Sequence, residues 1–208
     1  MEKQKHRVLF VLGGPGSGKG TQCENMVEQF KFKHFSTGDL LRAEVKKQSE
    51  LGKKIDSFIS KGNLVPGKVA VELIKQNIME QSTDTTFILD GYPRNQDNID
   101  CWQEVVQDDI DVIGCLYLEC AEETMKNRIM KRGETSGRSD DNEEVFANRI
   151  KVFQEQTVPC CEFFQKKDML YKVSAEGSKQ DCFEEVKQVL KKLAIDKEHR
   201  LKEMKEYL

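Results

Sequence analysis

The glycine-rich stretch near the start of the chain is the feature that most constrains its fold. Residues 12–21 read Leu-Gly-Gly-Pro-Gly-Ser-Gly-Lys-Gly-Thr and directly follow the apolar run 8–11. Gly13, Gly16 and Gly18 allow backbone angles closed to other residues, so consecutive N–H groups can point into one concavity and bind phosphate oxygens. Lys19 adds a positive charge for the terminal phosphates of a nucleotide. The pattern predicts a buried strand that runs into a phosphate-binding loop at the start of a helix.

One position of this loop departs from the usual P-loop. A P-loop normally has Ser or Thr directly after the lysine, where the hydroxyl ligates magnesium. Here Gly20 comes between Lys19 and Thr21, so Thr21 is a candidate magnesium ligand one position later. A glycine-rich turn without function is the alternative interpretation. The strand, the spacing, the lysine and the hydroxyl together favour the phosphate site.

Composition limits the classes of protein to consider. A chain of 208 residues suits one compact domain. The seven cysteines are odd in number, scattered and without Cys-x-x-Cys spacing, which predicts free thiols in a reducing compartment. The three histidines, His6, His34 and His199, lie far apart in sequence and give little support for a His/Cys metal site.

Charge and hydropathy exclude further classes. The net charge is −3 and the lysines are spread along the chain, so no nucleic-acid-binding stripe is expected. No apolar run approaches the roughly 20 residues of a membrane span. The charged start, residues 1–7, has no secretory core behind it. We therefore expect a cytoplasmic protein that binds neither nucleic acid nor membrane.

Short apolar runs recur between longer helical patterns and predict the strands. Such near-continuous apolar strands are typical of a parallel sheet covered by helices on both faces. The fold class is therefore α/β, a doubly wound parallel sheet of five strands. The expected strands are 8–12, a weaker one at 34–36, 86–90, 112–118 and 169–173.

Outside the strands the sequence indicates two helical regions and one polar flap. Residues 39–81 have room for several helices and no convincing strand, and Pro66 can start one of these helices. The polar segment 133–142 contains two glycines and predicts a mobile flap, with Asp140 or Asp141 as a cap of the next helix. An amphipathic helix is expected from about Ser178.

A second signal follows the strand at 86–90. An acidic residue at the end of a strand beside the P-loop is how P-loop enzymes hold the water shell of magnesium, so Asp90 is a candidate for that role. The alternative is an aspartate that caps a turn before Gly91. Arg94 follows in a turn at the carboxyl end of the strand, where α/β sheets bind ligands.

Arginines accumulate around the two predicted insertions. Arg42 lies in the first, and Arg128, Arg132, Arg138 and Arg149 flank or lie in the polar segment. Lone surface arginines usually form weak solvated pairs, but fixed guanidinium groups together can bind two sets of phosphate oxygens. A monophosphate acceptor is already ionised near neutral pH, so phosphoryl transfer to it needs no general base. The absence of a His/Asp catalytic arrangement therefore fits phosphoryl transfer between nucleotides.

Four ordered motifs resemble those of nucleoside monophosphate kinases of the adenylate kinase family. They are Gly-Gly-Pro-Gly-Ser-Gly-Lys-Gly-Thr at 13–21, Ser-Thr-Gly-Asp-Leu-Leu-Arg at 36–42, Asp-Gly-Tyr-Pro-Arg at 90–94 and Ser-Gly-Arg-Ser-Asp-Asp-Asn at 136–142. The resemblance implies one kinase domain over 1–208, with a helical acceptor-binding insert at 36–65 and a short lid at 131–141. The lid has no cysteine and resembles the small lids of the family, not the longer zinc-binding ones.

Within the family the chain is most similar to UMP-CMP kinases. Asn-Gln-Asp-Asn at 95–98 and the lid motif carry this similarity. Adenylate kinases typically have glutamine where Asn98 stands, and the shorter amide can pair with a pyrimidine edge held at a different depth. Thr37 argues the other way, because UMP-CMP kinases commonly have alanine there and adenylate kinases often have threonine.

The resemblance also implies roles for residues at the matching positions. The donor ATP would be held by Gly16, Ser17, Gly18, Lys19, Gly20, Thr21, Arg132 and, more weakly supported, Gly177. The acceptor would be held by Thr37, Arg42, Asn63, Leu64, Val65, Gly91, Tyr92, Pro93, Arg94, Asn98, Arg138 and Arg149. The catalytic set would be Lys19, Arg94, Arg132, Arg138 and Arg149, with Arg128 in the same cluster, and Mg²⁺ would be held by Asp90 through water and by Thr21.

The resulting hypothesis is a monomeric cytoplasmic enzyme that transfers phosphate from ATP-Mg²⁺ to UMP or CMP, with dCMP as a further candidate acceptor. An adenylate kinase that uses AMP is the first alternative. A non-catalytic nucleotide-dependent switch is the second, but a switch has no need of Arg42 and Arg94 at an acceptor phosphate.

Overall fold

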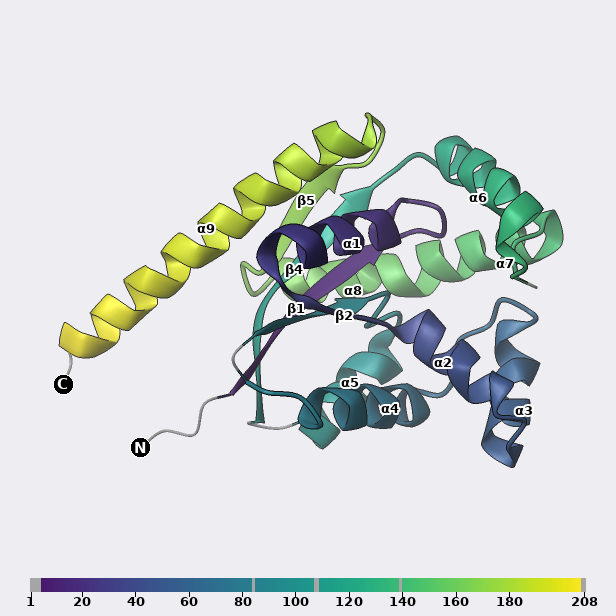
Figure 1. Cartoon of the computed structure of the whole chain (residues 1–208), viewed down its shortest axis with the longest axis horizontal. Coiled ribbons are helices and arrows are strands. Elements are labelled where there is room, and N and C mark those ends of the chain that lie inside the picture. The colour runs from purple at the N-terminus through teal and green to yellow at the C-terminus, as the bar shows by residue number, and fades with distance from the viewer. Residues whose placement is uncertain (1–4, 84, 107–108, 139, 207–208) are drawn as a thin grey trace.

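The computed structural model describes residues 5–83, 85–106, 109–138 and 140–206, with side chains up to Ala194. Its centre is a sheet of five parallel strands in the order β2-β3-β1-β4-β5 (Figure 1). The strands are β1 His6–Gly13, β2 Lys33–Ser36, β3 Thr86–Asp90, β4 Ile110–Glu119 and β5 Leu170–Ser174. The predicted five-stranded parallel sheet is therefore confirmed, including the weak strand around residues 34–36.

Helices cover both faces of this sheet, so the doubly wound arrangement is also confirmed (Figure 1). The helical elements, including a short π-helix η2, are α1 Lys19–Phe30, α2 Thr37–Lys46, α3 Glu50–Ile59, α4 Gly67–Met79, α5 Gln96–Val106, α6 Glu122–Ser136, α7 Glu143–Val152, η2 Phe153–Thr157, α8 Val158–Gln165 and α9 Lys179–Glu206. The predicted helical region 39–81 contains α3, α4 and most of α2, and Pro66 directly precedes α4.

Alternate side chains of β1 enter two different cores. Val8 and Phe10 pack with α4, α5 and α8, whereas Leu9 and Val11 pack with α1 and α9. All four side chains are at most 2% exposed. Successive residues of a strand point to opposite faces, so a strand buried on both faces must be apolar throughout. This explains why β1 shows no polar alternation in the sequence.

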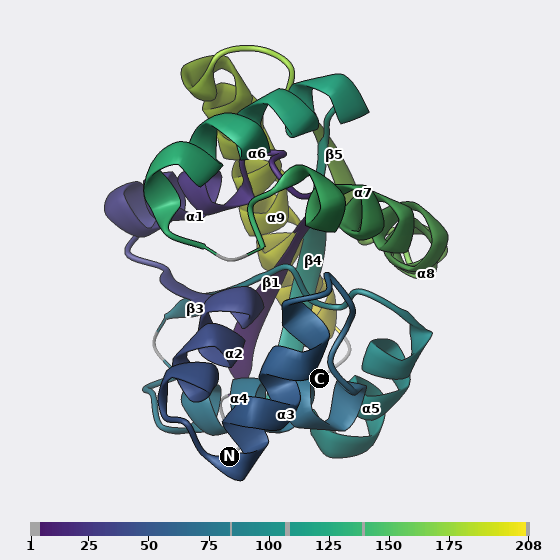
Figure 2. The same ribbon diagram turned by 90° about the vertical axis from the view of Figure 1, so that its right-hand side faces the viewer.

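Two helical segments stand apart from the main layers. Helices α2 and α3 share a small core of Leu41, Ile55 and Val65. Helices α6 and α7 share another, which includes Met125 and Phe146. Figure 2 shows α2 and α3 in the lower half of the molecule and α6 and α7 in the upper half.

The segment between α6 and α7 differs in two ways from its prediction. Residues 133–136 do not belong to a flap, because they continue α6 to Ser136, and the helix ends at Gly137 with a φ of 62°. The cap of α7 is Asn142, not Asp140 or Asp141, because its side chain accepts a hydrogen bond from Val145 N at 3.0 Å. Ser139 of the predicted lid lies outside the described residues.

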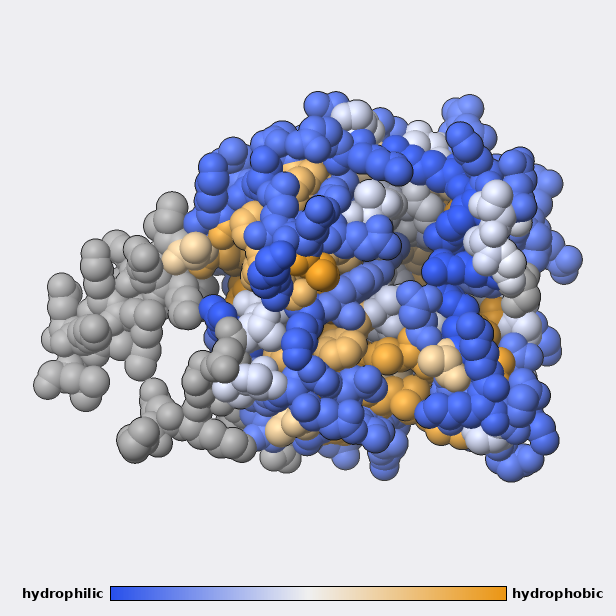
Figure 3. Space-filling model, in the orientation of Figure 1, coloured by the Kyte–Doolittle hydropathy of each residue, from blue (hydrophilic) through white to orange (hydrophobic). Residues whose placement is uncertain are grey.

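One face of the molecule is shown by hydropathy in Figure 3. It is mostly hydrophilic, and apolar side chains appear on it in separate areas. Among the described residues, none of the helices combines the length and the apolar composition that a membrane crossing requires.

Helix α9 should depend on Phe183, which is 1% exposed and packs between α9 and the sheet. We expect Phe183→Ala to lower the free energy of unfolding by about 3–5 kcal/mol, because the change loses burial and leaves a cavity. Urea denaturation would measure this. Phe30→Ala is the control, since Phe30 is 39% exposed and should cost about 1 kcal/mol or less. Equal losses in the two variants would contradict the packing role of Phe183.

Candidate active site

A cleft of about 920 Å³ opens at the carboxyl ends of β1 and β3. Most of the predicted site residues line it, namely Gly16, Ser17, Gly18, Lys19, Gly20, Thr21, Arg42, Asn63, Asp90, Arg94, Arg128, Arg132, Arg138, Arg149 and Gly177. The predicted residues outside the lining are Thr37, Leu64, Val65, Gly91, Tyr92, Pro93 and Asn98. The structure therefore brings residues from both ends of the chain to the strand ends, where parallel α/β sheets bind ligands.

The loop between β1 and α1 forms one wall of the cleft. Gly16 has a φ of 84°, and a Cβ there would lie 2.5 Å from Met125 O, so only glycine fits. Lys19 Nζ donates hydrogen bonds to Gly13 O at 2.8 Å and Gly14 O at 2.9 Å. Burial lowers the pKa of Lys19 to about 8, although Asp90 acts in the opposite direction. Lys19 is thus held against its own loop. An anion bound there would raise the pKa of Lys19 and favour its charged form.

Asp90 ends β3 and is only 8% exposed. Burial raises the pKa of its carboxyl, but His34, Lys19 and Arg94 outweigh this effect and keep the pKa below its usual range. His34 Nε2 lies 3.5 Å from Asp90 Oδ2. Asp90 and the hydroxyl of Thr21 offer oxygen donors in the same cleft, a donor set that suits a magnesium ion and its water shell.

Arg94 is held by contacts from several elements. Its Nε donates to Gly91 O at 2.6 Å, and its backbone N–H donates to Asn98 Oδ1 at 3.0 Å. From η2, Thr157 Oγ1 donates to Arg94 O at 2.8 Å. Burial, then the nearby Arg149, lowers the pKa of Arg94 to about 10, so the guanidinium remains charged at neutral pH. Thr157 was missed in the sequence, because no local pattern announces a π-helix.

Arg132 and Arg149 pair with aspartates of the segment between α6 and α7. Arg132 makes a two-pronged pair with Asp141, at 2.7 and 2.6 Å, and Arg149 lies 2.8 Å from Asp140. The sequence analysis assigned no such pairing role to these aspartates. The two consecutive aspartates, Asp140 and Asp141, close to Arg138 in the sequence are the signal that was available.

Two ion pairs join the segments on opposite sides of the cleft. Arg138 lies 3.3 Å from Asp39, which also pairs with Arg42 at 2.6 Å. Arg42 in turn lies 4.0 Å from Asp140. Helix α2 and the segment between α6 and α7 therefore meet through charged side chains, as their positions in Figure 2 suggest.

Among the described residues near the cleft, three buried polar atoms besides His34 Nε2 have no hydrogen-bond partner. They are Ser17 Oγ, Thr37 Oγ1 and Asn98 Nδ2. An unpaired buried donor is costly, and in native proteins such groups call for a ligand or a water. The amide oxygen of Asn98 is already occupied by Arg94 N, so its free donor is the part that can still bind something.

The structure also places three other residues that the sequence predicted for the site. Tyr92 is 1% exposed, packs in the core beside Phe10, and its hydroxyl donates to Asn98 O at 2.7 Å. Val65 is buried in the core shared by α2 and α3. Gly177 follows β5 and lines the cleft, as expected of a backbone contact.

Comparison with known proteins supports the resemblance found in the motifs. Residues 11–169 match the family model "Adenylate kinase". The chain is 45% identical over 184 residues to a probable UMP-CMP kinase 1 of Arabidopsis thaliana, with 88% of each chain covered. It is 42% identical over 185 residues to adenylate kinase isoenzyme 1 of Oryctolagus cuniculus, covering 88% of this chain and 93% of the relative. A UMP-CMP kinase of Danio rerio is 39% identical over 193 residues, covering 90% and 98%.

The Arg132–Asp141 pair gives a prediction about stability. The side chain of Asp141 is fully buried, whereas that of Arg132 is 37% exposed. We expect Asp141→Asn to lower the free energy of unfolding at pH 7 by about 1–3 kcal/mol, the scale of a hydrogen bond to a charged group. Asp111→Asn, at an exposed position of β4, is the control and should change stability by about 0.5 kcal/mol or less.

The same variant should reveal a pH dependence. Although burial raises it, the hydrogen bonds and charge of Arg132 keep the pKa of Asp141 below its usual value. A lowered folded-state pKa stabilises the protein above the unfolded value of about 4, and this stability is lost as the pH falls through the folded pKa. The difference in unfolding free energy between the wild type and Asp141→Asn, measured in urea, should therefore shrink as the pH falls below about 4 and through the folded-state pKa. A constant difference down to pH 2 would contradict this.

Proposed function

Because this chain belongs to the adenylate kinase family and is thus a nucleoside monophosphate kinase, we propose that it phosphorylates UMP and CMP. The reaction moves the terminal phosphoryl group of ATP-Mg²⁺ to the pyrimidine monophosphate and yields ADP and the diphosphate. The observation that carries this proposal is the cleft itself, which gathers the phosphate loop, Asp90 and the arginines listed above. One nucleotide would not need so many fixed cations, but two phosphate groups brought together would.

On the donor side, the loop residues Gly16 to Thr21 would hold the ATP phosphates. Lys19 would leave the carbonyls of Gly13 and Gly14 and follow the transferred group, since a phosphate offers it a full negative charge. Arg132 would serve the lid side of ATP, and the backbone at Gly177 its base. The magnesium ion would be held by Asp90 through water and by Thr21, and it would neutralise charge on the phosphates.

On the acceptor side, Arg42 and Arg94 would bind the monophosphate. Arg138 and Arg149 would bridge the transferred and acceptor phosphates, each by exchanging an aspartate for phosphate oxygens. No side chain has to remove a proton, because the acceptor phosphate is largely ionised above its second pKa of about 6. Arg128 lines the same cleft and would add to its positive charge.

The acceptor nucleoside would lie against the insert at 36–65 and the loop after β3. The insert would contribute Thr37, Asn63, Leu64 and Val65. The loop would contribute Gly91, Tyr92, Pro93 and Asn98, partly through backbone. The free buried groups Thr37 Oγ1 and Asn98 Nδ2 support this location, because a base edge would give them the partners they lack.

Closure of the lid, 131–141, and the insert over the nucleotides would exclude water. Water competes with the acceptor for the phosphoryl group, so an open site would hydrolyse ATP. The contacts of Arg138 with Asp39 and of Arg42 with Asp140 support this proposal, because they show that the two segments can meet across the cleft. The seven free thiols support a reducing, cytoplasmic location, and a monomer is the simplest assembly.

Adenylate kinase activity is the second candidate. Thr37 and the 42% identity to a relative named adenylate kinase favour it. Asn98 in place of glutamine favours the pyrimidine acceptor. Thr37 and Asn98 therefore predict different acceptor bases.

A panel of acceptors separates the candidates. With ATP-Mg²⁺ and AMP, UMP, CMP, dCMP or GMP, we expect nucleoside diphosphate to form fastest with UMP or CMP. Coupled detection of ADP together with chromatography of the products would measure this. Best turnover with AMP would reject the pyrimidine assignment, and no phosphorylated acceptor would favour a nucleotide-dependent switch.

Arg94→Ala should lower turnover by about 10³-fold or more, because a fixed arginine that aligns and neutralises the acceptor phosphate in phosphoryl transfer can contribute on that scale. ATP affinity, measured by calorimetry, should change little. Arg94→Lys is the matched variant that keeps the positive charge but loses the planar guanidinium group. Its turnover should lie between those of the wild type and Arg94→Ala. Near-normal turnover of a folded Arg94→Ala would remove this residue from the acceptor site.

Asn98→Gln should shift the preference toward AMP. The added methylene moves the amide donor closer to the base and suits a different edge. The ratio of kcat/KM values for CMP and AMP would measure the shift, with ATP kinetics as the internal control. An unchanged ratio would mean that Asn98 does not read the base.

A further inference from the structure

A cluster of three metal-binding side chains lies beside the phosphate loop. The ligand atoms of Cys23, His34 and Asp90 all lie within 4.8 Å of one another. Within the described ranges this is the one group of three or more Cys, His or acidic residues so arranged. Cys23 and Asp90 are buried, and His34 is half-buried.

The topology of the sheet explains how residues so far apart in sequence meet. β2 pairs with β3 in parallel, and His34 lies beside Ile88, which faces α1. Asp90 lies two residues after Ile88, so its side chain points to the same face. Cys23 comes from α1, which covers that face. The cluster is therefore built on two strands and a helix, the rigid elements of the fold.

The geometry of the cluster suits a tetrahedral ion. Zn²⁺ binds imidazole nitrogen and carboxylate oxygen at about 2.0 Å, which separates two such ligand atoms by about 3.3 Å. His34 Nε2 and Asp90 Oδ2 lie 3.5 Å apart. His34 Nε2 faces the Asp90 carboxylate and has no closer hydrogen-bond partner, so an ion between the two groups would replace only this long contact.

The chemistry of the three side chains favours zinc over magnesium. Sulfur and imidazole ligands suit Zn²⁺, whereas Mg²⁺ prefers oxygen. A Cys23 thiolate and an Asp90 carboxylate together carry two negative charges, which balance the ion. We propose that Cys23, His34 and Asp90 form a binding site for Zn²⁺, with water in the fourth position. Binding transfers the Cys23 thiol proton to solvent and forms the zinc–sulfur bond.

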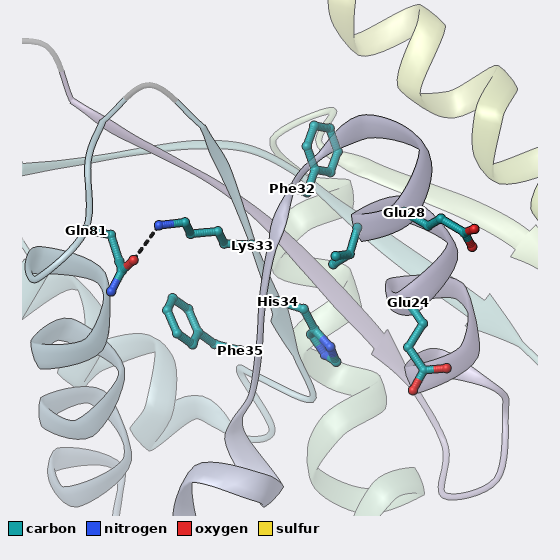
Figure 4. Close-up of a pocket in the computed structure, with 8 residues that line it drawn as sticks. Glu24, Glu28, Phe32, Lys33, His34, Phe35 and Gln81 are labelled. Carbon is teal, nitrogen blue, oxygen red and sulfur yellow. Dashed lines mark hydrogen bonds between the residues drawn. The ribbon is translucent and has the colours of Figure 1, made fainter.

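The ion has a route to this site. His34 and Asp90 line the nucleotide cleft, and His34 also lines a second hollow of about 590 Å³. Figure 4 shows His34 in this second hollow with Glu24 and Glu28 on α1 at its side. These two carboxylates attract divalent cations toward His34.

Zinc at this site would inhibit the kinase. This consequence, unlike zinc binding itself, rests on the proposed function, because it requires Asp90 to hold the water shell of magnesium. With its carboxylate bound to zinc, Asp90 could no longer serve that shell. The inhibition would be relieved by a chelator and would not require oxidation of a thiol.

The binding test uses the full chain, kept reduced with a phosphine, and competition of Zn²⁺ with a chromophoric chelator. The wild type should bind one zinc ion, and Cys23→Ala should bind it at least about tenfold more weakly. Cys115→Ala is the matched control, because both thiols are fully buried and Cys115 lies in the other core. Circular dichroism checks that each variant is folded.

Co²⁺ gives a second readout that does not depend on activity. The wild type and Cys115→Ala should show a thiolate-to-cobalt charge-transfer band that is absent in Cys23→Ala. If Cys23→Ala does not fold, His34→Asn replaces it and should weaken both Zn²⁺ and Co²⁺ binding. Equal zinc affinity in the wild type and a folded ligand variant, or a wild-type cobalt complex without the band, would overturn the site.

Inhibition is measured separately, at constant Mg²⁺ and acceptor. Zinc should inhibit the wild type and Cys115→Ala at concentrations that leave Cys23→Ala active. Zinc binding in a chain that phosphorylates no acceptor would refute the proposed function and leave the zinc site standing. Binding without inhibition of an active enzyme would overturn the regulatory consequence alone.

Discussion

The structure depends on neutralising the positive charge that its cleft concentrates. Lys19, Arg42, Arg94, Arg132 and Arg149 line one hollow, and like charges so close together destabilise a folded chain. Aspartates relieve this repulsion, since Asp39 pairs with Arg42, Asp141 with Arg132 and Asp140 with Arg149. The carboxylate of Asp141 is even fully buried to pair with the partly exposed Arg132. An anionic ligand can enter because the same arginines can exchange one acidic partner for another.

Much of the fold followed from local sequence. The central strands β1 and β3 were predictable because they are buried on both faces and are therefore largely apolar, and β3 matched its expected bounds, Thr86–Asp90. The glycine loop identified the edge of the sheet at which ligands bind. The order of the strands and the packing of α2 on α3 depend on contacts between distant residues, which a single sequence does not display.

The candidate site could be predicted from the sequence to about the same extent as the fold. The arginines that line the cleft were found from their clustering and from the family motifs. Their acidic partners were missed, since aspartates in a polar segment resemble ordinary helix caps, and the cap proved to be Asn142. His34 illustrates the same limit, because its distance in sequence from Asp90 and Cys23 concealed that β2 and β3 are neighbours.

The π-helix η2 has a mechanical consequence. Helix α7, η2 and α8 follow one another without a break, from Glu143 to Gln165. This rod carries Arg149 near one end, supports the backbone of Arg94 through Thr157, and anchors its other end in the core through Phe164. The distance between the guanidinium groups of Arg94 and Arg149 is thereby set by a continuous helix and not by a loop. The lid, 131–141, can rearrange while Arg94 and Arg149 keep their separation.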